Sequence, residues 1–207
     1  MQSITHAGNP HLGSPDNELT LVAGLLGRAF VEDPGIVFSD PLRARRERWL
    51  PRLYYETARY SRAVGGIELV EGRGAALWIE NRTEPTVLEV FRHRLWSIPF
   101  VMGFGPWWRL MRHEAYCSAR VRQLCPKRYG YLWILGVDPT AQGQGYGRRA
   151  VEATLQSVAD RGHEICILKT ETPSNVSFYQ SLGFRCIDEQ VVPASNLRYW
   201  LFQRALR

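Results

Sequence analysis

The stretch Gln142–Arg149 reads QGQGYGRR, with a glycine at every second position and two arginines at its end. It follows YLWILGV at 131–137, whose apolar alternation predicts a strand, and precedes a helical apolar pattern at 145–161. Glycine lets backbone N–H groups approach a ligand closely, and a helix N-terminus adds partial positive charge. We therefore expect this turn to bind a phosphate or pyrophosphate.

Two other interpretations of the turn fail on their surroundings. Gly145-x-Gly147-x-x-Ala150 fits a dinucleotide fingerprint, but DPTAQGQ separates it from the strand. Too few residues follow Ala150 to complete the sheet of a nicotinamide-nucleotide domain. A Walker A loop is excluded because no Gly-Lys-Ser/Thr is present. A plain glycine turn without a ligand remains the simplest alternative.

The rest of the chain predicts alternating elements. Apolar residues at helical spacing predict a helix from an Asn17 cap to Asp33-Pro34 and a second over 41–63. GIELV and GAALWIE bracket a turn and predict a hairpin. Further along, we expect a strand at 165–171, a short helix in NVSFYQSLGF and two final strands.

The loop motif resembles the acetyl-CoA loop of the GCN5-related N-acetyltransferases, the GNAT family. That resemblance rests on Gln142-x-x-Gly145-x-Gly147 after LGVDP, and continues through a segment similar to the family's N-x-x-F/A-Y-x-x-x-G-F, from Asn175 to Phe184. A closing W-x-x-x-R, with AFVEDP and GAALWIE, is similar to puromycin N-acetyltransferase-like proteins. The match is strong over 131–207 and only an outline before it.

The resemblance implies an α/β (α+β) fold, a mixed and largely antiparallel sheet flanked by helices. In that fold the strands 131–137 and 165–171 run parallel and splay apart to admit the pantetheine arm of acetyl-CoA. It implies one domain over 1–207, with the acetyl-CoA-binding half at 131–207. The cofactor-binding residues that it implies are Leu135, Gly136, Val137, Gln142, Gly143, Gln144, Gly145, Tyr146, Gly147, Arg148, Asn175 and Phe178.

Acetyl transfer to an amine needs a neutral amine, oxyanion donors and a proton for the leaving thiolate. By its place in the family motif, Tyr179 is the candidate acid; its alternative role is packing. Many relatives carry LET where this chain has Leu168-Lys169-Thr170, so Lys169 replaces a carboxylate. Glu171, on the same strand face, and Glu80, at the end of ALWIE, are the candidate bases. A water chain could replace both.

Residues 84–125 are predicted to be a helical, acceptor-side segment broken by IPFVMGFGP. Large rings crowd it, among them Trp96, Phe100, Phe104, Trp107 and Trp108. They form either core or an aromatic wall over a pocket.

Composition limits the remaining classes. The net charge of +6 is concentrated at 43–62, but Glu47 and Glu56 interrupt the basic run, which favours a solvated helix face over a nucleic-acid surface. No apolar run is long enough to span a bilayer, and no secretory signal is visible. Residues 1–16 are predicted to be a loose arm, in which SITHA could form a short first strand. The four cysteines lack zinc-site spacing, so we expect a reducing, cytoplasmic setting and no metal.

Together these patterns predict an N-acetyltransferase that uses acetyl-CoA and a small-molecule amine, with no nucleic-acid or membrane partner and a homodimer left open. The alternative is a non-catalytic acyl-CoA-binding or regulatory module that kept the loop and lost turnover.

Overall fold

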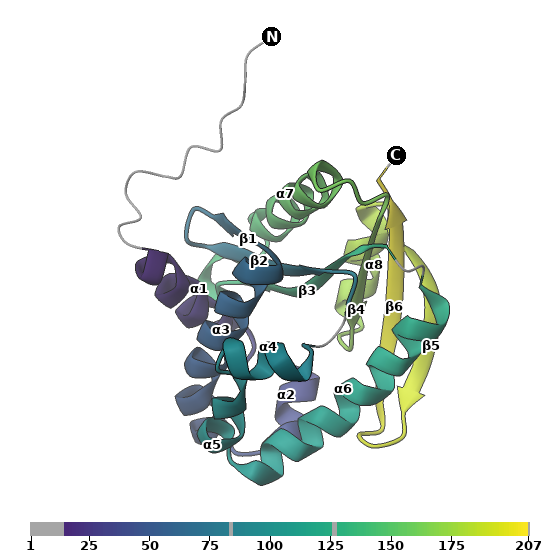
Figure 1. The fold of residues 1–207 in the computed structure, drawn as a ribbon. Coiled ribbons are helices and arrows are strands. Elements are labelled where there is room, and N and C mark those ends of the chain that lie inside the picture. Colours follow the sequence, from purple (N-terminus) through teal and green to yellow (C-terminus); the bar gives the residue numbers. More distant parts are fainter. Residues whose placement is uncertain (1–14, 83–84, 126–127, 207) are drawn as a thin grey trace.

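The computed structural model describes residues 15–82, 85–125 and 128–206 (Figure 1). Their strands form one six-stranded sheet in the order β1-β2-β3-β4-β6-β5. The only parallel neighbours in that sheet are β3 and β4. The predicted mixed, largely antiparallel sheet is confirmed. The strands are β1 Gly65–Val70, β2 Gly74–Glu80, β3 Gly130–Val137, β4 Ile165–Thr170, β5 Arg185–Val192 and β6 Leu197–Ala205.

The parallel pair separates partway along its length. Pairing between β3 and β4 runs from Gly130 opposite Cys166 to Leu132 opposite Leu168 and then stops, although β3 continues to Val137. The later backbone groups of β3 therefore have no ladder partner on the β4 side. This is the splay that the family resemblance implied.

A β-bulge lies where the splay begins. On the other edge of β3, Ile134 pairs with Leu77 and Leu132 pairs with Trp78, so Trp133 is an extra residue in the ladder. Such a bulge interrupts the two-residue alternation and turns side chains to new directions. Three consecutive side chains, Trp133 to Leu135, consequently line one cavity.

Helices cover both faces of the sheet (Figure 1). Ala75 and Leu77 of β2 pack in one buried cluster with α1 and α3, while Ala76 packs in another with α7. Alternate residues of a strand point to opposite faces, so α7 lies across the sheet from α1 and α3. The helices are α1 Pro15–Ala29, α2 Pro34–Ser39, α3 Arg43–Val64, α4 Val87–Arg92, η1 Leu95–Ser97, α5 Ile98–Met102, α6 Phe104–Leu124, η2 Pro139–Ala141, α7 Tyr146–Asp160 and α8 Ser174–Ser181.

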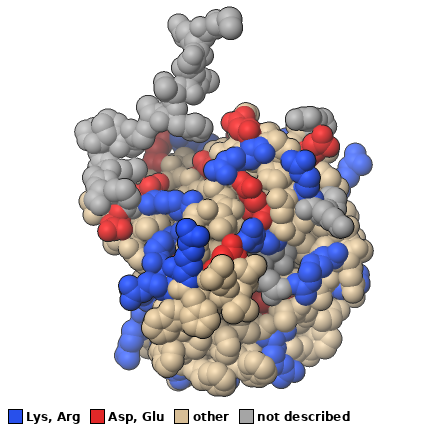
Figure 2. Space-filling model, in the orientation of Figure 1, with Lys and Arg blue, Asp and Glu red and all other residues tan. Residues whose placement is uncertain are grey.

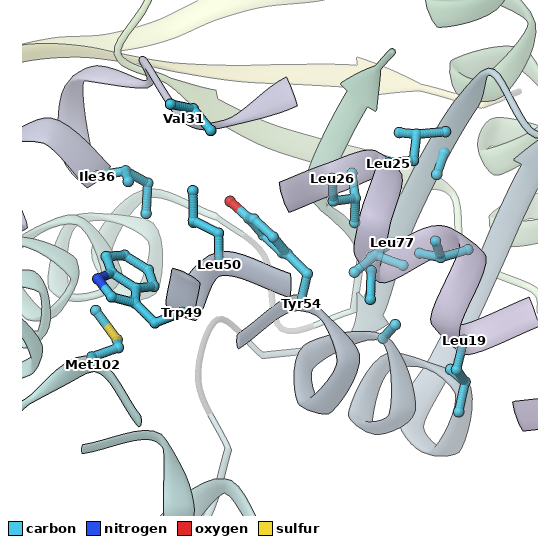
Figure 3. Close-up of a cluster of buried hydrophobic side chains, with 14 of the residues drawn as sticks. Leu19, Leu25, Leu26, Val31, Ile36, Trp49, Leu50, Tyr54, Leu77 and Met102 are labelled. Carbon is cyan, nitrogen blue, oxygen red and sulfur yellow. The ribbon is translucent and has the colours of Figure 1, made fainter. Parts of the chain in front are cut away.

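The cluster beneath α1 and α3 fixes the position of the turn between α1 and α2. Figure 3 shows Tyr54 of α3 among Leu26 of α1, Leu50 of α3 and Leu77 of β2, and all four side chains are buried. Each fully buried leucine stabilises the fold by roughly 1.5–3 kcal/mol. The residues that follow α1 are therefore held against the sheet, close to the splay.

Two element boundaries differ from those expected. Helix α1 begins at Pro15 rather than after an Asn17 cap, since proline is favoured in a first helical turn. The expected arm therefore ends earlier, and its residues 1–14, with SITHA, lie outside the described residues. The break expected at IPFVMGFGP is itself mostly helical, because α5 and α6 are separated only by Gly103, whose φ is 88°.

Candidate active site

The splay opens onto a cavity of about 360 Å³. Four regions far apart in sequence meet around it: the bulge of β3, the end of β4, α8, and the turn between α1 and α2. Residues 85–118 form much of the remaining wall. The lining residues with the most bearing on chemistry are Asp33, Glu114, Trp133, Leu135, Lys169, Glu171, Asn175 and Tyr179.

The glycine turn has the backbone conformation that an anion site requires. Gly143 and Gly145 have φ of 76° and 86°, and Gly145 caps the N-terminus of α7. A Cβ built at either glycine meets no atom within 4 Å, so the space above the turn is open. The first N–H groups of α7 have no partner within the helix and are free to face a ligand.

Side chains around the turn hold it in place. Asp138 accepts from the hydroxyl of Thr140 at 2.6 Å, from Arg28 at 2.7 Å and from the backbone N–H of Thr140 at 3.0 Å, and these contacts lower its pKa to about 2. Gln144 donates to the carbonyl of Thr140, while Gln142 is exposed. The carboxylate is therefore ionised at any working pH and ties the turn to α1.

The two arginines after the turn have different partners. Arg149 pairs with Glu71 at 2.6 Å, and Tyr146 donates to the same carboxylate. Arg148 reaches Ser181 of α8 at 3.1 Å and has a longer ion pair with Glu152 at 3.8 Å, and both arginines are exposed. Arg148 is thus the freer of the two to meet an anion held by the turn.

Gly145→Asp is expected to weaken acetyl-CoA binding at least ~10-fold, equivalent to ~1.4 kcal/mol. The change puts a negative side chain where the turn would hold a pyrophosphate. Calorimetric titration of the folded variant with acetyl-CoA measures it. Gly162→Asp is the matched control, because Gly162 follows the other end of α7 with φ of 81° and equally open space. Equal losses in both variants would contradict the assignment.

Helix α8 presents Tyr179 to the cavity. The ring is 5% exposed and packs against Phe178, Phe184 and Phe202, with its burial raising the pKa of the phenol above the ordinary value. Asn175, one turn earlier, also lines the cavity and donates to Thr170 at 3.2 Å. Burial therefore keeps the phenol protonated and also makes it a weaker acid than an ordinary tyrosine, so its use as a proton donor depends on its position beside the thiolate.

Phe178 and the end of β3 lie beside the cavity rather than in its wall. A Cβ on Gly147 would lie 3.3 Å from Val137 and 3.5 Å from Phe178. A Cβ on Gly136 would overlap Leu26 of α1 at 2.6 Å. These glycines therefore let α7 and α1 pack closely against the strand that carries Leu135.

Glu171 forms an ion-paired network instead of standing free. It accepts from Lys169 at 2.6 Å, and its other partner is Nε2 of His113 at 3.1 Å. Burial opposes ionisation of this carboxyl, but the Lys169 ammonium and His113 outweigh it and lower the pKa to about 2. Because an ionised carboxylate only accepts, we assign the proton to Nε2. So weak a base is poorly matched to deprotonating an amine.

Glu80 does not reach the cavity, which corrects its assignment as a candidate base. It lies opposite Gly130, at the end of β3 where β3 and β4 are still paired. Its carboxylate binds Arg161 at 2.8 Å and lies 3.7 Å from His163. Its role is to join β2 to the end of α7.

Asp33 is the carboxylate that sequence reasoning missed. It lines the cavity and makes no salt bridge among the described residues, and its Oδ1 accepts the N–H of Ile36 at 3.1 Å. Burial, reinforced by the charge of Glu171, raises its pKa to about 6. The sequence signal was present in VEDPG, but it was interpreted as a helix end and as part of a family resemblance, and not as the source of a base.

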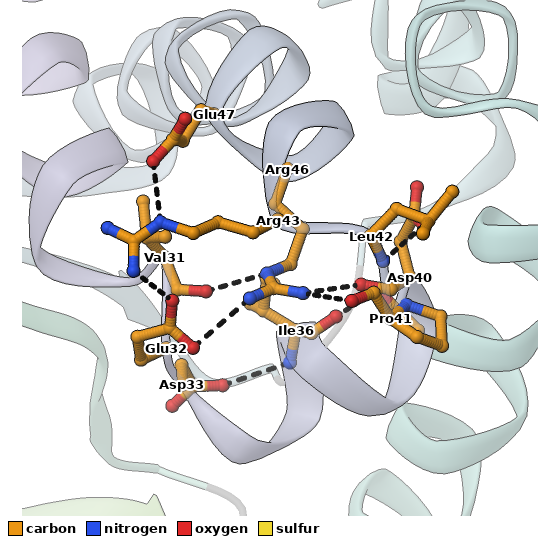
Figure 4. A network of polar contacts seen from close by, with 11 residues as sticks. Val31, Glu32, Asp33, Ile36, Asp40, Pro41, Leu42, Arg43, Arg46 and Glu47 are labelled. Carbon is orange, nitrogen blue, oxygen red and sulfur yellow. Dashed lines mark hydrogen bonds and ion pairs between the residues drawn. The ribbon is translucent and has the colours of Figure 1, made fainter.

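A buried arginine holds the Asp33 turn rigid, as Figure 4 shows. Arg46 of α3 donates to the carbonyls of Val31 at 2.7 Å, Asp40 at 3.0 Å and Pro41 at 2.8 Å. It also pairs with Glu32 at 3.1 Å. The Arg46 guanidinium therefore binds backbone carbonyls both before and after α2, and Asp33 is the N-cap residue of that helix.

The aromatic residues of 84–125 divide into two groups. Trp96 and Trp107 line the cavity, whereas Phe100, Phe104 and Trp108 do not and are 81%, 69% and 52% exposed. The segment therefore supplies a partial aromatic wall, and three of its rings are neither wall nor core.

Trp107→Ala is expected to raise the KM for the acceptor at least ~10-fold while leaving the KM for acetyl-CoA nearly unchanged, because burying such a ring against a ligand stabilises binding by at least ~1.5 kcal/mol. Trp108→Ala is the matched control on the adjacent, exposed position. Steady-state kinetics with both substrates varied separates the two constants. A change in both KM values, or an equal effect of Trp108→Ala, would mean that Trp107 acts through the fold.

One cluster of possible metal ligands occurs among the described residues. His113, Cys117 and Glu171 bring ligand atoms within 4.8 Å of one another. Burial raises the pKa of the Cys117 thiol to about 12, and Lys169 already binds Glu171. A protonated thiol beside an ammonium does not suit a cation, so the expectation of no metal stays a prediction.

Comparison with known proteins identifies the family. Residues 37–184 match the Acetyltransferase (GNAT) family. The chain belongs to this family. Its members use acetyl-CoA as co-substrate.

The curated relatives match a smaller region. Mycothiol acetyltransferase of Catenulispora acidiphila is 36% identical over 92 residues, 43% of this chain and 26% of that protein. The chain thus spans about a quarter of the length of the curated relatives that it matches. Two solved structures share the fold. One is a polyamine N-acetyltransferase of Drosophila melanogaster, with 18% identity and a TM-score of 0.59 over 93% of this chain and 97% of that chain. The other is arylalkylamine N-acetyltransferase 2 of Aedes aegypti, with 16% identity and a TM-score of 0.60 over 91% of this chain and 94% of that chain.

The surface shows no single-sign field on the face drawn in Figure 2, where basic side chains are scattered and acidic ones lie among them in the upper part. In the basic run of α3, Arg43 pairs with Glu32 and Glu47, and Arg52 pairs with Glu56. Within the described ranges, no helix combines the length and apolar character needed to cross a membrane.

Proposed function

We propose that this GNAT protein transfers the acetyl group of acetyl-CoA to the primary amine of a small molecule. One observation carries the proposal. A half-buried carboxylate without a salt bridge among the described residues, Asp33, and a buried phenol, Tyr179, line the same cavity at the end of the β3–β4 splay. Acetyl transfer to an amine needs a base and an acid at one place.

The backbone of β3 and the glycine turn hold the donor. Backbone groups of Leu135 to Val137, unpaired on the β4 side, bind the pantetheine arm, and the residues from Gln142 to Arg148 bind the pyrophosphate. Asn175 and Phe178 flank the path of the arm. The acetyl carbonyl then lies at the splay, where a backbone N–H of β3 can stabilise its oxyanion.

Asp33 accepts the proton of the acceptor ammonium, directly or through one water. A carboxyl with a pKa of about 6 is ionised at neutral pH and is a far better base than an ordinary aspartate. The freed amine forms a bond to the acetyl carbon, and the C–S bond of the thioester breaks. The nitrogen then releases its second proton to water, Tyr179 donates its proton to the CoA thiolate, and the phenolate takes a proton back from water. Binding both substrates in one cavity supplies the orientation that the reaction needs.

Release of the CoA thiol is the test, measured with acetyl-CoA and a panel of primary amines that includes phenethylamine, agmatine and an aminonucleoside. The aminonucleoside examines the resemblance to puromycin N-acetyltransferase-like proteins. Amine-dependent thiol release supports the proposal. Tight acetyl-CoA binding with no release for any amine would favour the non-catalytic alternative, which the free carboxylate and phenol at the splay argue against.

A further inference from the structure

The charged side chains that line the cavity differ in whether they already have an ion-pair partner. Three carboxylates line it, from Asp33, Glu114 and Glu171, and among the described lining residues Lys169 is the one basic side chain. Lys169 lies 3.0 Å from Glu114 and 2.6 Å from Glu171. A single ammonium on β4 therefore occupies two of the three carboxylates, and Asp33 alone has no salt bridge.

Lys169 is held in this position as a charged group. Its side chain is 11% exposed. Burial alone would lower its pKa, but Glu114 and Glu171 raise it well above the ordinary value. The ammonium is therefore permanent across the working pH range, and a cationic ligand does not displace it without leaving a buried charge unpaired.

The remaining wall is apolar and aromatic. Phe30, Leu53, Trp96, Ile98, Trp107 and Met111 line the cavity as well. A second ammonium placed against this wall would lose its hydration without gaining a counter-ion, which is costly. An alkyl or aromatic body would instead gain from being buried.

We propose that Lys169 determines acceptor specificity and makes this a site for monoamines with an apolar body, not for diamines or polyamines. The inference rests on the proposed function. In this inference Asp33 binds the reacting amine. Lys169 pairs with the two carboxylates that a second cationic group would otherwise bind.

The test compares three acceptors of equal length: hexylamine, aminohexanol and hexamethylenediamine. We expect kcat/KM for hexylamine to exceed that for the diamine at least ~10-fold, which is equivalent to ~1.4 kcal/mol. The reason is that the second ammonium of the diamine has no counter-ion in the cavity. The amino alcohol separates polarity from charge and should fall between them. Equal kcat/KM for hexylamine and the diamine overturns the inference while leaving the proposed function intact, whereas no thiol release with any amine overturns the proposed function itself.

Lys169→Gln and Lys169→Arg then test the residue itself. With the ammonium removed, Glu114 and Glu171 are available to a second amine, so the preference for hexylamine should shrink at least ~10-fold. The arginine variant keeps the charge and should keep the preference. An unchanged preference in folded Lys169→Gln, checked by its melting temperature, overturns the role of Lys169. If Lys169→Gln does not fold, a preference lost in Lys169→Arg overturns it equally.

Discussion

Asp33→Asn is expected to lower kcat/KM for the amine by ~10²–10⁴-fold, the range of a positioned general base. Asparagine has nearly the same shape and remains a good helix N-cap, so the turn before α2 should persist. The variant loses only the ability to take a proton. Steady-state thiol release at neutral pH measures the effect.

The pH dependence distinguishes a base from a positioning residue. In the wild type, kcat/KM should fall as pH drops through about 6, because protonated Asp33 cannot accept a proton. The variant should lack this acid limb. A retained limb at the same pH would assign the titration to another group, and a loss of less than about two-fold would be too small for a base.

The stability of Asp33→Asn supplies the control for folding. Burial raises the native pKa of Asp33 to about 6, above the ordinary aspartate value of about 3.9. The folded state therefore binds the proton more tightly, and ionisation destabilises it as pH rises from about 4 to 6. Removing the charge should stabilise the protein above pH ~6, by up to about 3 kcal/mol for a shift of this size. Denaturant unfolding at pH ~5 and ~8 measures the difference.

Tyr179→Phe is expected to reduce kcat and kcat/KM together by ~10²–10⁴-fold, with acetyl-CoA affinity nearly unchanged. The ring stays among its aromatic neighbours, so packing is preserved, and only the hydroxyl that would protonate the thiolate is lost. Because its pKa is raised, the wild-type phenol stays protonated to beyond pH ~10, and no alkaline limb from this group should appear below that pH.

Tyr129→Phe is the matched control for this change. Tyr129 is also 5% exposed, but it precedes the paired end of β3 and does not line the cavity. Its variant should keep activity within about two-fold of wild type. If Tyr179→Phe behaves in the same way, Tyr179 is a packing residue and water is the proton source.

The sequence predicted the parts of the site that depend on neighbours in the chain. The turn around Gly145 follows from left-handed backbone and a helix start, which are local properties. Tyr179 and Asn175 lie one turn apart on α8, so their shared direction could also be anticipated. The order of helices and strands along the second half of the chain followed from local patterns, and the parallel strand pair followed from the family resemblance.

The parts that depend on long-range packing could not be predicted. His113 and Glu171 are 58 residues apart in the sequence, and no local pattern around His113 predicts that the two side chains are in contact. The bulge at Trp133 arises from the register with β2, which strand alternation does not reveal. Glu80 was misjudged because the end of a strand says nothing about which end of the sheet it occupies.

The most direct test of the account is to identify the product formed from hexylamine and acetyl-CoA. The account predicts N-acetylhexylamine in an amount equal to the CoA thiol released, with wild-type protein, and almost none with Asp33→Asn at neutral pH. Thiol release without the amide, or amide formation undiminished in Asp33→Asn, would contradict it.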